Sequence, residues 1–171
     1  MKKNLIYFAD LVHNGTIQSI DTFPLGIGFV ASYLKEKHPD TIIKMFKLPQ
    51  ELNEALKEEM PTIMCFSNFT WNLNLSIEFS KYIKSVDKNI PIVFGGPNIP
   101  INTDECETFL KKYAEIDFYI KQDGEHAFEN LYKKLNENNF DINKVKQLDP
   151  ITLDNALFIN DNNIWQGQIK R

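Results

Sequence analysis

The sequence predicts a doubly wound α/β domain with a five-stranded parallel sheet of the flavodoxin-like type, helices on both faces and a C-terminal β-hairpin. Short apolar runs rich in β-branched and aromatic residues alternate with longer segments whose apolar residues recur at helical spacing. Strands that alternate with helices in this way form a parallel sheet, because each right-handed crossover lays a helix on one of its faces. For five such strands, the order 2-1-3-4-5 is the simplest arrangement.

Each predicted strand is followed by a predicted helix. The strands are expected at 5–9, 41–46, 62–66, 91–94 and 117–121. The helices are expected at 24–37, 50–59 and 72–86, then from about Thr103, and finally after Gly124. In the last helix, apolar residues at 128, 131, 132 and 135 follow the i, i+3, i+4, i+7 spacing that gives one buried face.

A polar stretch at 136–139 ends the alternation, and a hairpin is predicted beyond it. The apolar segments 156–159 and 164–165 flank the turn sequence Asn-Asp-Asn-Asn. Because an isolated hairpin is marginal in water, it is expected to pack on the main domain or on a part of the protein outside this chain. The sequence therefore divides into a domain over 1–140 and a linker with its hairpin over 141–171.

Composition excludes several classes of protein. A formal net charge of −4, from 19 basic and 23 acidic residues, argues against a general binder of nucleic acid. No apolar run approaches the roughly 20 residues that cross a bilayer, so no membrane association is expected. Cys65 and Cys106 form neither a disulfide framework nor a Cys-x-x-Cys motif, which fits a cytoplasmic protein.

Four segments are expected at the carboxyl ends of the strands, where open parallel sheets bind ligands. A purely structural role competes at each of them: a helix cap, a tight turn, or a carboxylate at a helix N-terminus. The candidate cofactor-binding residues in these segments are Asp10, His13, Gly15, Ser67, Asn68, Phe69, Thr70, Gly95, Gly96, Pro97, Gly124 and Glu125.

Taken in order, these segments resemble the cobalamin-binding fold. Proteins of that fold often carry Asp-x-His-x-x-Gly after the first strand, Ser-x-Leu after the third and Gly-Gly after the fourth. Here Ser67-x-Phe69 precedes Gly95-Gly96 at a spacing close to that of the family. The most similar variant is the N-terminal domain of cobalamin-dependent radical SAM enzymes, through segments 24–28, 92–97 and 117–128.

The resemblance implies cobalamin as the cofactor, with its dimethylbenzimidazole tail in a slot lined by Ser67 and the glycine pair. It also implies His13 as the ligand beneath the cobalt, held by Asp10. The spacing Asp10-x-x-His13-x-Gly15 differs by one residue from the family pattern. Many radical SAM relatives hold cobalamin without a protein ligand beneath the metal, and that arrangement is favoured here.

Radical SAM chemistry requires Cys-x-x-x-Cys-x-x-Cys for its [4Fe–4S] cluster, and the sequence contains no such motif. The cluster, S-adenosylmethionine and the radical SAM barrel are therefore expected in a further domain of the same full-length chain, as parts of a methyltransferase-like or related radical enzyme. By itself this chain is not expected to be catalytic. Two alternatives stay open: a degenerate module of this fold that serves as a docking domain, and another doubly wound protein such as a flavodoxin or a response-regulator receiver.

Overall fold

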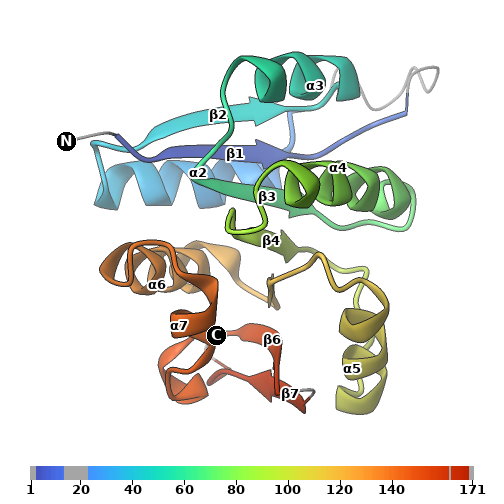
Figure 1. The fold of residues 1–171 in the computed structure, drawn as a ribbon, viewed down its shortest axis with the longest axis vertical. Helices are drawn as coiled ribbons and strands as arrows, with labels where there is room; N and C mark the ends of the chain where they lie inside the picture. Colours follow the sequence, from blue (N-terminus) through green and yellow to red (C-terminus); the bar gives the residue numbers. More distant parts are fainter. Residues whose placement is uncertain (1–2, 14–22, 162, 170–171) are drawn as a thin grey trace.

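The computed structural model describes residues 3–13, 23–161 and 163–169, and a single sheet runs through this part of the chain (Figure 1). Its strand order is β2-β1-β3-β4-β5-β6-β7. The strands are β1 (Leu5–Ala9), β2 (Ile42–Phe46), β3 (Ile63–Ser67), β4 (Ile92–Gly95), β5 (Phe118–Ile120), β6 (Ala156–Asn160) and β7 (Asn163–Gln166). The first five are parallel, which confirms the predicted order 2-1-3-4-5.

The C-terminal hairpin continues this sheet. β6 pairs antiparallel with β5, with Tyr119 opposite Leu157, and β7 pairs antiparallel with β6. The sheet of the described residues therefore has seven strands instead of the five expected, because β6 takes the edge of β5 that would otherwise be exposed. Of the two expected positions for the hairpin, packing on the main domain is the one observed.

Helices cover both faces of the sheet (Figure 1). One face packs against α2 (Leu25–Lys37) and α6 (Gly124–Glu137). The other packs against α3 (Pro49–Glu58), α4 (Leu73–Val86) and α5 (Thr103–Lys112). The short α7 (Ile142–Lys146) and a 3-10 turn at Pro150–Thr152 were not predicted. No helix in the described ranges is both long and apolar enough to cross a membrane.

Side-chain alternation along the strands creates two cores. In β1, Leu5, Tyr7 and Ala9 join the core beneath α3, α4 and α5, whereas Ile6 and Phe8 join the core beneath α2 and α6. All five are buried. This is why the strand reads as a continuous apolar run instead of an alternating one.

A buried carboxylate ties the end of α4 to the sheet. Asp117 Oδ2 accepts hydrogen bonds from Lys84 Nζ at 2.6 Å and from the backbone N–H of Ile92 at 2.8 Å. Lys146 Nζ of α7 lies 3.9 Å from Oδ1 of the same carboxylate. Burial raises the pKa of Asp117, and the two lysines oppose that shift.

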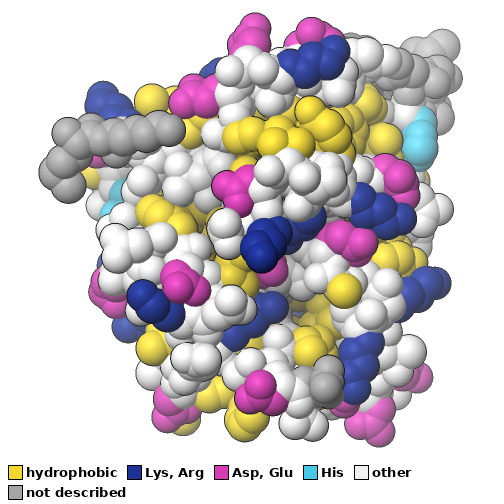
Figure 2. Space-filling model, viewed as in Figure 1, with side chains coloured by type: hydrophobic (Ala, Val, Ile, Leu, Met, Phe, Trp, Pro, Cys, Tyr) yellow, Lys and Arg dark blue, Asp and Glu magenta, His cyan; other side chains and the backbone are white. Residues whose placement is uncertain are grey.

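The outer surface mixes charges of both signs. On the face seen in Figure 2, Lys and Arg side chains are interspersed with Asp and Glu side chains instead of gathering in one patch. This distribution agrees with the small formal net charge of −4.

Candidate functional site

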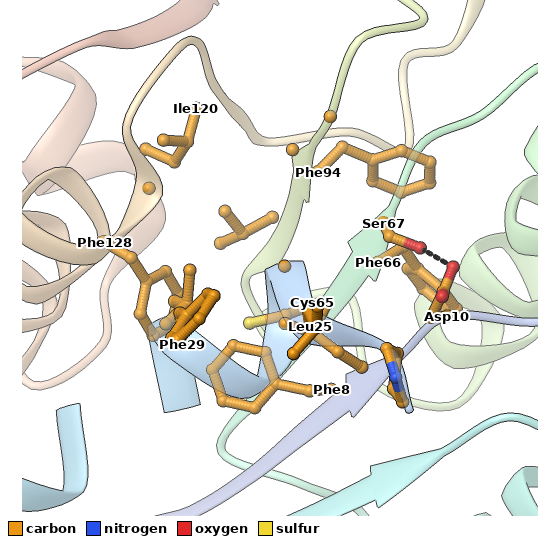
Figure 3. Close-up of a pocket in the computed structure, with 18 of the residues that line it drawn as sticks. Phe8, Asp10, Leu25, Phe29, Cys65, Phe66, Ser67, Phe94, Ile120 and Phe128 are labelled. Atoms are coloured by element: carbon orange, nitrogen blue, oxygen red, sulfur yellow. Dashed lines mark hydrogen bonds between the residues drawn. The ribbon is translucent and has the colours of Figure 1, made fainter. Parts of the chain in front are cut away.

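A cavity of about 500 Å³ opens beside the carboxyl ends of β1, β3, β4 and β5, on the side of the sheet that α2 and α6 cover. Figure 3 shows side chains from both layers around this space. The strands contribute Phe8, Cys65, Val93 and Ile120, and the helices contribute Leu25, Ile27, Phe29, Val30 and Phe128.

The cavity is apolar inside and polar at one side of its rim. Asp10 and Ser67 stand together where β1 and β3 end, on the side of the space opposite Phe29 and Phe128 (Figure 3). At the mouth, Leu25 and Phe29 keep 61% and 58% of their surface exposed. Adjacent apolar side chains left in water beside a concave site are typical of a surface that a ligand or partner covers.

A hydrogen-bonded group fixes the rim where β1 and β3 end. Ser67 Oγ donates to Asp10 Oδ1, and Asn72 Nδ2 reaches Ser67 Oγ and Asp10 Oδ1, each at 3.4 Å. Asn72 is fully buried, and its Oδ1 accepts the backbone N–H of Phe69 at 2.8 Å. It also occupies the N-cap position of α4, in agreement with the helix predicted from residue 72.

The loop after β4 forms another wall of the cavity. Gly96 has a φ of +126°, and a Cβ on it would lie 2.7 Å from the backbone oxygen of Asn68. Both the conformation and the close approach therefore require glycine at this position. A Cβ on Gly95 would instead make ordinary contact, 3.6 Å from the backbone oxygen of Ile120.

Eight of the twelve predicted site residues line this cavity, namely Asp10, Ser67, Phe69, Gly95, Gly96, Pro97, Gly124 and Glu125. Asn68 and Thr70 are not among its lining residues. Gly15 lies outside the described residues.

His13 also stands apart from the cavity lining. Its side chain is exposed, and Nε2 lies 2.7 Å from the backbone oxygen of Trp71, whose ring stacks on Phe69 with the centroids 4.5 Å apart. A carbonyl oxygen can only accept, so Nε2 carries the proton in this contact. Within the described ranges, no group of three or more His, Cys, Asp or Glu side chains could hold a metal ion.

The lining residues that the sequence reasoning missed lie in the strands, in helices α2 and α6, and in the loops that precede these helices. Phe8, Cys65 and Val93 point into the cavity from the core face that α2 and α6 cover. Strand alternation would have placed them there once that face was known to carry the site. Gln122 also lines the cavity, at a φ of 60°, and its residue type gives no signal of that conformation.

Comparison with known proteins points to one family. Residues 19–132 match the family model described as the B12 binding domain. The chain is 26% identical over 115 residues to the cobalamin-dependent radical SAM methyltransferase TokK of Streptomyces tokunonensis, covering 63% of this chain and 16% of that protein. It is 22% identical over 131 residues to the 2-(S-pantetheinyl)-carbapenam-3-carboxylate methyltransferase of Streptantibioticus cattleyicolor, covering 74% of this chain and 18% of that protein.

Solved structures give the same fold. The cobalamin-dependent S-adenosylmethionine radical enzyme OxsB, with aqua-cobalamin and S-adenosylmethionine bound, superposes with a TM-score of 0.74 at 16% identity, over 99% of this chain and 23% of that one. A cobalamin-binding protein from Desulfitobacterium hafniense superposes with a TM-score of 0.55 at 14% identity, over 78% of this chain and 59% of that one. This chain therefore spans a small part of the radical SAM proteins that it matches.

Proposed function

Because this chain belongs to the B12-binding domain family, we propose that it binds cobalamin and takes the dimethylbenzimidazole tail of the cofactor into the cavity between the sheet and helices α2 and α6. The observation that carries the proposal is the form of that cavity. It is apolar inside, it opens at the carboxyl ends of the strands, and its β4 wall lacks side chains at Gly95 and Gly96.

The residues present fit a flat aromatic base. Val93 and Ile120 face the cavity, and Gly95 follows on the same face of the sheet, beside Ile120 in the register. A side chain at position 95 would therefore extend into the cavity. Phe8 and Phe128, which pack edge to face with ring centroids 5.3 Å apart, give the space aromatic walls. Such walls suit a planar, largely apolar group.

In this proposal the protein holds the cofactor and keeps water from its tail. When bound, cobalamin supplies the cobalt centre that carries the transferable group, and the protein supplies binding and orientation. Ser67 and Asp10 present polar groups at the rim, where the polar parts of the tail leave the cavity. Since Nε2 of His13 contacts the backbone oxygen of Trp71, we favour an arrangement without a protein ligand beneath the metal.

We further propose that this module works beside a radical SAM barrel of the same full-length protein and supports methyl transfer or related radical chemistry. The support is that one relative is a radical SAM methyltransferase and another is a methyltransferase, and that this chain covers only 16% and 18% of their lengths. In this proposal the barrel holds the [4Fe–4S] cluster and S-adenosylmethionine. The exposed Leu25 and Phe29 at the mouth of the cavity lie where a cofactor or barrel would cover them.

The test is a direct binding measurement on the 171-residue chain. The protein is incubated with hydroxocobalamin, freed of unbound cofactor by gel filtration, and examined by visible absorption. The proposal predicts a coloured protein peak with close to one corrinoid per chain. A colourless peak under aerobic and anaerobic conditions alike would contradict it and favour the docking-domain alternative.

A further inference from the structure

A buried tyrosine on the opposite face of the sheet is connected to the cavity wall. Tyr119 is fully buried in β5, within the core beneath α3, α4 and α5, whereas the cavity lies on the α2 and α6 side. Its hydroxyl donates to the backbone oxygen of Gly96 at 2.8 Å. Tyr119 is not among the lining residues, but the residue that it holds is one of them.

Asn68 completes the connection between β5 and the loop after β4. Its Nδ2 donates to the Tyr119 hydroxyl at 3.1 Å and to the backbone oxygen of Asn98 at 2.7 Å, and its Oδ1 accepts from Asn98 Nδ2 at 3.2 Å. The backbone N–H of Asn68 donates to Gly95 at 2.6 Å, and that of Asn98 donates to Asn68 at 3.2 Å. Both N–H groups of the Asn68 side chain and its oxygen thus form hydrogen bonds that hold the loop.

The hydrogen bonds of Tyr119 and Asn68 hold the loop after β4 in one conformation. They fix Gly96 at a φ of +126°, a backbone region that few residues adopt, and they press the loop against the backbone of residue 68. Burial raises the pKa of Tyr119 far above its usual range, so the hydroxyl keeps its proton and donates across the whole working pH range. A loop with so many fixed groups presents a preformed wall to a ligand.

We propose that Tyr119 and Asn68 are positioning residues for the cofactor: acting across the sheet, they hold the Gly95–Pro97 wall of the cavity in its binding shape. This inference rests on the proposed function. Asn68, which the sequence suggested as a cofactor contact, is in this proposal a residue that supports the Gly95–Pro97 wall without contacting the cofactor. Neither residue lines the cavity, so an effect on binding has to pass through residues that do, and the hydrogen bond of Tyr119 reaches Gly96 among them.

The test compares Tyr119→Phe with Tyr7→Phe. Both tyrosines are fully buried strand residues of the same core, and both donate to backbone oxygens. Tyr7, however, donates to Ala55 within α3 and to Glu59 at the end of that helix. Each variant removes one hydroxyl. Loss of a hydrogen-bonded anchor is expected to weaken hydroxocobalamin binding by about three- to tenfold in Tyr119→Phe, while Tyr7→Phe keeps the wild-type affinity.

A second readout needs no cofactor. Hydrogen exchange of the Asn98 amide, which donates to Asn68, is expected to accelerate in Tyr119→Phe and not in Tyr7→Phe. If Tyr119→Phe does not fold, Asn98→Ala, which removes one bond to Asn68, is measured in its place with the same expected direction.

The outcomes separate this inference from the proposed function. Wild-type affinity in Tyr119→Phe, or an equal loss in both variants, would overturn the positioning role while cobalamin binding stands. A wild-type chain that binds no corrinoid would overturn both.

Discussion

Replacing Gly95 with valine is expected to weaken cobalamin binding strongly without unfolding the protein. Gly95 ends β4 and lies beside Ser67 and Ile120 in the sheet register. Its added Cβ would sit 3.6 Å from the backbone oxygen of Ile120, an ordinary van der Waals distance, so the protein itself has room for the side chain. The two further carbons of valine extend into the 500 Å³ cavity that the cofactor tail is proposed to fill.

The substitution is expected to affect protein stability and cofactor affinity differently. Valine is favoured over glycine in a strand by up to about 1 kcal/mol, so thermal stability is expected to stay level or to rise. The tail and the new side chain cannot share one volume, so affinity for hydroxocobalamin is expected to fall more than about 100-fold, or about 2.7 kcal/mol. Gly95→Ala, with a smaller side chain at the same site, is expected to lose less affinity for hydroxocobalamin than Gly95→Val.

The assay is a titration followed by absorbance, with thermal unfolding of the same samples as the folding control. If folded Gly95→Val bound the cofactor within threefold of the wild type, the tail would not occupy this cavity, and the assignment of the site would be wrong.

Three further expectations follow from other parts of the molecule. Gly96→Ala is expected to lower the free energy of unfolding, measured in urea, by about 1–3 kcal/mol, because alanine must adopt strained backbone at a site with no room for Cβ. Lys84→Met leaves the carboxylate of Asp117 without its closest cation. Since burial raises the pKa of that carboxyl, the stability difference between variant and wild type is expected to be small below about pH 4, where the carboxyl is protonated. It is expected to grow to a loss of about 2 kcal/mol in the variant by pH 7, measured in urea at both pH values. His13→Ala is expected to leave the visible spectrum of bound hydroxocobalamin unchanged, and a shifted spectrum would point to cobalt ligation.

The order of the parallel strands could be predicted because local pattern and global topology agree. Segment 62–66 reads as a buried strand and is one, since helices cover both faces of the sheet at β3. The position of Ser67 and the glycine pair at the rim followed from the general rule that parallel sheets bind ligands at their carboxyl edge. No detail of side-chain packing was needed for either prediction.

What the sequence could not predict depends on contacts between distant segments. Asn68 follows a strand at the ligand edge, and only the fold shows that its amide meets Asn98 and Tyr119 instead of the cavity. The hairpin could be recognised from its turn, but its pairing with β5 depends on which sheet edge is free. His13 contacts Trp71, 58 residues away in the chain, and a contact over such a separation could not be predicted from the sequence.

The central claim, that the cavity receives the nucleotide tail of cobalamin, is tested most directly by comparing two corrinoids. Cobalamin carries the dimethylbenzimidazole tail, and cobinamide has the same corrin ring without it. Titration of the wild-type chain with each is expected to show cobalamin binding at least about 100-fold more tightly, a difference of about 2.7 kcal/mol, and Gly95→Val is expected to remove that preference. Equal affinity for the two corrinoids in the wild type would contradict the account.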